Sequence, residues 1–116
     1  MSRPLILLLT GLLAAPLAWS HAKPQQQSPA PESTVASPAE IRLVFNENIE
    51  PAFSMLSVAN AKGESVTAAK AAVDDATHRT LTLPLPALAP GMYVVKWAAV
   101  GPDGHRVKGS YSFTVK

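Results

Sequence analysis

Three histidines carry most of the chemistry that this sequence could perform. They are His21, His78 and His105, and the chain has no cysteine. The missing cysteine excludes thiolate sites for zinc or Cu(I), and it requires a fold that forms without disulfides. His78 lies in the polar stretch Asp74–Arg79, where a histidine is ordinarily a surface residue, and we assign it no metal role.

The first 20 residues have the parts of a signal peptide. Arg3 gives a positive start, residues 5–17 form a broken apolar run, and Ala18 and Ser20 are small residues before a cleavage site. The apolar run is too short for a transmembrane helix, which needs about 20 residues. We therefore expect residues 1–20 to be removed on export and the mature protein to have no membrane span.

Cleavage after Ser20 makes His21 the first residue of a mature domain, residues 21–116. An N-terminal histidine offers its α-amine and its ring Nδ1 to one metal ion, and together they close a six-membered chelate ring. Cu(II) suits this pair because it prefers planar nitrogen and oxygen ligands and binds strongly among divalent ions. Cleavage after Ala22 also fits the small-x-small pattern and would leave a domain without this chelate.

A second set of donors lies in Pro102-Asp103-Gly104-His105. Residues two apart on an extended segment point to the same side, so Asp103 and His105 could present a carboxylate and an imidazole to one point. Glu47 follows an apolar segment that ends at Phe45. In a β-sandwich it could reach the same end of the fold as Asp103 and His105. The alternatives are a turn residue for Asp103 and a solvated loop carboxylate for Glu47.

Strand-like alternation runs through most of the mature chain. Apolar and polar residues alternate over three segments, residues 41–46, 92–100 and 107–115. Shorter strands are expected at residues 53–58, 65–70 and 81–85, with turns at 61–64, 89–91 and 102–104. This pattern predicts an all-β fold, a single antiparallel β-sandwich.

Other segments leave alternatives open. Residues 21–38 contain four prolines and are either a disordered tail or an extended edge strand. Residues 67–76 are rich in alanine, which favours a helix, but they show no apolar stripe. Met55 and Met92 lie in apolar strand segments, and we expect both in the core.

Charge and motifs exclude several classes of function. Without Arg3, nine Lys and Arg residues are scattered among eight Asp and Glu residues, which is no footprint for nucleic acid. The chain contains no Gly-x-Ser-x-Gly, His-Glu-x-x-His or phosphate-binding glycine motif. We predict that the protein is not an enzyme.

Several segments together resemble the CopC family of periplasmic copper-resistance proteins, over essentially all of residues 21–116. They are His21-Ala22-Lys23, Ser28-Pro29-Ala30, Ile41–Glu47, Leu88–Val100, Asp103-Gly104-His105 and Gly109–Val115. The combination of Pro-Gly-x-Tyr-x-Val-x-Trp with a closely following Asp-x-His is specific. Asn46 departs from the family, which often has Ser before the Glu.

The resemblance implies a Greek-key sandwich of about seven strands, cupredoxin-like or immunoglobulin-like in shape. It also implies a Cu(II) site made of His21, Glu47, Asp103 and His105. Asp103 would either bind the ion through a carboxylate oxygen or hold the α-amine of His21 in place. Glu47 would be either a weak ligand or a residue that supports the ligands. Some relatives carry a Met-rich Cu(I) loop, but residues 52–70 hold only Met55 and no histidine, which implies a Cu(II)-only member.

The resemblance further implies a periplasmic copper carrier or buffer, with an inner-membrane transporter of the CopD type as partner. We expect a monomer.

Two alternatives to a copper carrier stay open. An N-terminal histidine with a second histidine also resembles the copper brace of polysaccharide monooxygenases, although the chain is short for that and its aromatic residues fall mostly on core positions. The other alternative is a metal-free β-sandwich that acts as an adhesion or chaperone module.

Overall fold

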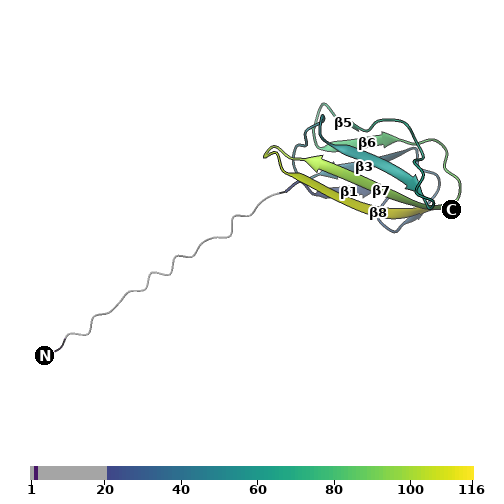
Figure 1. Cartoon of the computed structure of the whole chain (residues 1–116), viewed down its shortest axis with the longest axis horizontal. Helices are drawn as coiled ribbons and strands as arrows, with labels where there is room; N and C mark the ends of the chain where they lie inside the picture. The colour runs from purple at the N-terminus through teal and green to yellow at the C-terminus, as the bar shows by residue number, and fades with distance from the viewer. Residues whose placement is uncertain (1, 3–20) are drawn as a thin grey trace.

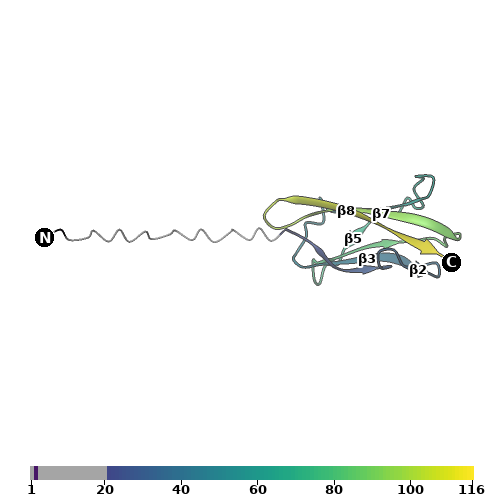
Figure 2. The ribbon, with the colours of Figure 1, turned by 90° about the horizontal axis from the view of Figure 1, so that it is seen from below.

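The protein forms a two-layered β-sandwich, shown by a computed structural model that describes Ser2 and residues 21–116. Its strands are β1 (Pro24–Ser28), β2 (Thr34–Val35), β3 (Glu40–Phe45), β4 (Met55–Asn60), β5 (Ala72–Val73), β6 (Thr80–Pro84), β7 (Gly91–Val100) and β8 (Arg106–Val115). They form two four-stranded sheets, ordered β1-β3-β6-β5 and β2-β8-β7-β4. Figure 2 shows the layers edge-on, with β7 and β8 in one and β3 in the other.

Alternating side chains build the core between the sheets. In β3, Ile41, Leu43 and Phe45 are buried, and the residues between them are more exposed. In β7, Tyr93, Val95 and Trp97 are buried in the same way. The rings of Phe45 and Trp97 meet edge to face across the layers, with centroids 5.4 Å apart. The predicted period-two pattern is therefore confirmed.

The all-β prediction is confirmed, with eight strands where about seven were expected. Two of the strands, β1 and β2, lie within residues 21–38. The edge-strand alternative for this segment is therefore correct. β1 pairs antiparallel with β3, and Pro24 begins it at the sheet edge, where no partner needs its missing N–H. β2 pairs with β8 in parallel, so the second sheet is mixed.

Three shorter predictions are wrong. Neither a helix over residues 67–76 nor a strand over 65–70 forms. Ser65 makes an isolated bridge to Ala59, and Ala72–Val73 pair as β5 against β6, whereas no helix forms because the segment has no apolar stripe to bury. Met55 and Met92 are 60% and 54% exposed, because both project from the outer face of their sheet.

No helix among the described residues is long and apolar enough to cross a membrane. The predicted signal peptide lies in residues 1–20, which apart from Ser2 are outside the described part.

Two distant parts of the chain meet at one end of the sandwich. β7 and β8 are antiparallel, and residues 101–105 connect them. Pro24 at the start of β1 pairs with Phe45 at the end of β3. In Figure 1 the β7–β8 connection and the start of the blue-purple segment lie at the same end. This end therefore brings residues near 21, 46 and 103 together.

Candidate metal centre

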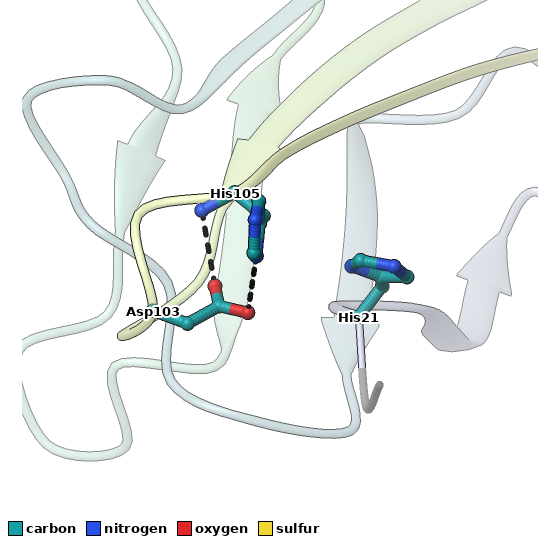
Figure 3. Close-up of side chains that lie close together, drawn as sticks. All are labelled: His21, Asp103 and His105. Atoms are coloured by element: carbon teal, nitrogen blue, oxygen red, sulfur yellow. Dashed lines mark hydrogen bonds and ion pairs between the residues drawn. The ribbon is translucent and has the colours of Figure 1, made fainter. Parts of the chain in front are cut away.

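The β7–β8 connection is a tight turn that places Asp103 beside His105. Gly104 has a φ of +79°, which glycine adopts without steric cost, and its N–H donates to the carbonyl of Gly101 at 3.0 Å. The backbone N–H of His105 donates to Asp103 Oδ1 at 3.0 Å, and His105 Nδ1 lies 2.7 Å from Asp103 Oδ2 (Figure 3). The two side chains were expected to meet along an extended segment, and they meet through this turn instead.

Hydrogen bonds keep the Asp103 carboxyl ionised. The bond from the His105 ring, and then the bond from its backbone N–H, hold the pKa of Asp103 below its usual 3.8, and a smaller desolvation effect acts in the opposite direction. With its proton on Nδ1, His105 donates to Asp103, and its Nε2 carries the lone pair that a metal would accept. The His105 and Asp103 side chains are 49% and 40% exposed, so an ion can reach them from solvent.

His21 approaches this pair from the other sheet. One donor atom from each of His21, Asp103 and His105 lies within 4.8 Å of the others. The two imidazole rings are 5.5 Å apart between centroids and nearly perpendicular, as Figure 3 shows. His21 Nδ1 is buried and has no hydrogen-bond partner. A buried ring nitrogen without a partner, next to a carboxylate and a second imidazole, is a donor set that could hold a cation.

Glu47 adjoins this group without being part of it. Its Oε1 is buried and has no hydrogen-bond partner. A Cβ placed on Gly101 would lie only 2.6 Å from Glu47 Oε1 and 3.4 Å from Asp103 Oδ1, so both carboxylates lie close to this glycine. The structure thus brings three of the four predicted site residues together and places Glu47 beside them.

Sequence reasoning gave Asn46 no role, yet it holds the segment that carries His21. Its Oδ1 accepts a hydrogen bond from the Lys23 N–H at 2.8 Å, and its Nδ2 donates to the His21 carbonyl at 3.4 Å. The only available signal was the departure from Ser at this position. His78 is held elsewhere, with its N–H bonded to the Asp74 carbonyl, and it is not in the three-residue group.

The candidate donors lie apart from two hollows on the surface. Two hollows of about 450 and 630 Å³ lie nearby, and both are lined in part by Met55 and Arg106. Neither is lined by His21, Asp103 or His105.

Comparison with known proteins identifies the family. Residues 24–116 match the family model described as the CopC domain. The chain belongs to the CopC family. Protein YobA of Escherichia coli K12 is 38% identical over 111 residues, which cover 94% of this chain and 90% of YobA.

Two solved CopC-type structures have the same fold as this chain. CopC from Methylosinus trichosporium OB3b is 39% identical, with a TM-score of 0.77 over 83% of this chain and 94% of that one. PcoC, a methionine-rich copper resistance protein from Escherichia coli, is 34% identical, with a TM-score of 0.70 over 84% and 100%. The predicted CopC membership is confirmed. Relatives with a functional name are copper resistance proteins, which agrees with the prediction that the chain is not an enzyme.

Proposed function

We propose that this CopC protein binds one Cu(II) ion with His21, Asp103 and His105, for copper resistance, homeostasis or transport. One observation carries the proposal. Three donor side chains, 84 residues apart at their extremes, each have a donor atom within 4.8 Å of the others, and the Nδ1 of His21 is buried without a partner. The CopC family membership and the copper resistance name of PcoC support the choice of copper.

Each residue has a chemical role in the proposed site. His21, as the first mature residue, offers its α-amine and Nδ1, and His105 offers an imidazole nitrogen. Asp103 orients the His105 ring through the 2.7 Å contact and adds negative charge that offsets that of the ion. Glu47 supports the site beside Gly101 or acts as a weak ligand.

The donor types favour Cu(II) over Cu(I). Nitrogen and oxygen atoms make up the group, whereas Cu(I) prefers thiolate and thioether ligands. Met55 pairs with Ala98 and Met92 with Thr114, so six positions along β7 separate the two methionines. This spacing argues against a shared thioether site and supports a Cu(II)-only protein, in contrast to the methionine-rich PcoC.

The proposed function requires export with cleavage after Ser20. Ala22 is 1% exposed and belongs to the core, so cleavage after Ala22 would remove a buried residue as well as the histidine. This burial favours a mature chain that begins at His21. We place that chain in the periplasm as a monomer, where its solvent-accessible Asp103 and His105 allow copper exchange with an inner-membrane partner of the CopD type.

The test is the intact mass of the exported protein, recorded with and without one equivalent of Cu(II). We expect a chain that begins at His21 and gains one copper. His21→Ala should lose most of the copper affinity, and His78→Ala should retain it as the matched control. A chain that begins at Lys23, or full affinity in His21→Ala, would contradict the proposal. Hydrogen peroxide production by the copper-loaded protein would favour the monooxygenase alternative.

A further inference from the structure

The first residues of the mature chain are held against the sandwich by contacts that involve none of the candidate donor side chains. We propose that Asn46 and Ala22 form an anchor that fixes this segment and so preorganises His21 for the ion. Both are positioning residues, since neither is among the candidate donors. The consequence for copper rests on the function proposed above, whereas the anchoring itself is a property of the metal-free protein.

Asn46 binds the backbone of two terminal residues. Its backbone N–H donates to the Lys23 carbonyl at 2.9 Å, and its side-chain Oδ1 accepts from the Lys23 N–H at 2.8 Å. Both backbone groups of Lys23 are therefore satisfied by one residue. The Asn46 Nδ2 also donates to the His21 carbonyl at 3.4 Å, a longer bond that adds a third point of attachment. These bonds continue the β1–β3 pairing beyond Pro24 and Phe45.

Ala22 fixes the segment from the other side. It is 1% exposed and lies in the core cluster, while Lys23 is exposed and His21 is partly buried. A methyl group in the core with hydrogen bonds on both neighbouring residues leaves the backbone at His21 little freedom. Chain termini without such attachment are generally disordered. The anchor therefore determines where the His21 side chain lies.

Asparagine suits this position because its two polar atoms act at once. Oδ1 accepts from one backbone group while Nδ2 donates to another, whereas a Ser hydroxyl would offer a single shorter-reaching oxygen. A terminal segment that is already ordered loses less conformational entropy when the ion binds. Asn46 should therefore tighten copper binding without contacting the ion.

The test compares Asn46→Ala with wild type in mature protein that begins at His21. In the metal-free state, we expect the variant to lose hydrogen-exchange protection at the Lys23 amide and order at His21, both measured by NMR. Its Cu(II) dissociation constant should rise about 10-fold, the effect of one net hydrogen bond. The EPR spectrum of the loaded variant should stay as in wild type, because the donors are unchanged. Asn46→Ser should recover part of the affinity.

Asn60→Ala is the matched control. Asn60 also accepts two backbone N–H bonds, from Lys62 and Glu64, in the turn after β4, away from His21. This variant should keep wild-type copper affinity and Lys23 protection. Ala22→Leu tests the anchor without altering β3, because the larger side chain cannot fit the buried position and should displace the terminal segment.

The outcomes separate the two proposals. Wild-type affinity together with wild-type Lys23 protection in Asn46→Ala and Ala22→Leu would overturn the anchor and leave the copper proposal intact. If wild type binds no copper, the proposed function fails, and the NMR measurements on metal-free protein still decide whether the anchor exists. Equal losses in Asn60→Ala and Asn46→Ala would show a general loss of stability and would also overturn the anchor.

Discussion

At the residue scale, the candidate site depends on one pair of side chains in a turn. Asp103 holds the His105 ring through Nδ1 and the His105 backbone through its N–H. The carboxylate thereby selects which ring nitrogen can bind a metal, a role that supporting carboxylates commonly have around metal-bound histidines. The same contacts lower the pKa of Asp103, so its protonation reports on the geometry of the pair.

We expect the Asp103 carboxyl of the metal-free protein to titrate below 3.8. Because its pKa is lower in the folded than in the unfolded chain, the pair stabilises the fold above the unfolded pKa, and this stabilisation is lost as pH falls through the lowered folded pKa. His105→Ala should move the pKa of Asp103 back toward its usual value, and His78→Ala should leave it lowered. Carboxyl-detected NMR titration measures this, and an unmoved pKa in His105→Ala would refute the assigned cause.

At the scale of elements, the β7–β8 hairpin carries both of these residues and must be held rigidly against the other sheet. Trp97 in β7 packs against Phe45 of β3 and lies opposite Gly109 of β8. A Cβ on Gly109 would lie 2.5 Å from the Trp97 ring, so the ring occupies the space of the missing side chain. The pairing of a glycine with a large buried ring thus couples the hairpin to the core.

Gly109→Ala should therefore destabilise the whole protein. The added methyl group forces a rigid, 9% exposed ring to move, and such overpacking typically lowers the free energy of unfolding by about 1–3 kcal/mol. Thermal unfolding followed by circular dichroism should show a melting temperature lower by at least about 4 °C. The exposed neighbour Ser110→Ala is the control, with little change expected. An unchanged melting temperature in Gly109→Ala would mean that the Trp97 ring moves aside without cost, which would contradict this prediction.

At the scale of the whole molecule, the candidate site joins the two sheets. His21 precedes β1 in one sheet, and Asp103 and His105 connect β7 and β8 in the other. In the unfolded chain the His21 chelate is separated from the other donors, so the full set exists only in the folded state. The folded chain should therefore bind the ion more tightly than the unfolded chain does. A bound ion should stabilise the fold for this reason.

Copper should raise the melting temperature at pH 7.5 and do so much less at pH 5.5. The α-amine and the imidazoles must lose their protons to bind, so protons compete with Cu(II) for these nitrogens more strongly at the lower pH. Differential scanning calorimetry with one equivalent of Cu(II) measures the shift. His21→Ala should show little shift at either pH, and equal wild-type shifts at both would exclude this donor set.

The sequence by itself determined the features that depend on local chemistry. Period-two alternation in residues 41–46 and 92–100 predicted the buried faces of β3 and β7, because side chains along a strand alternate between its two sides. The residue types of His21, Asp103 and His105 also predicted a copper site, which stays a prediction. For Met55 and Met92, an apolar sequence context could not tell the inner face of a sheet from the outer one.

The tertiary structure alone decided which distant residues meet. The approach of His21 to His105, the place of Glu47 beside Gly101 and the bonds of Asn46 to the terminal segment all depend on strand pairing and on the packing of two sheets. Such contacts join residues far apart in the chain, and the free energy that fixes them comes from the whole core. No local pattern around Asn46 predicted its bonds to the terminal segment, so only the assembled sandwich could assign them.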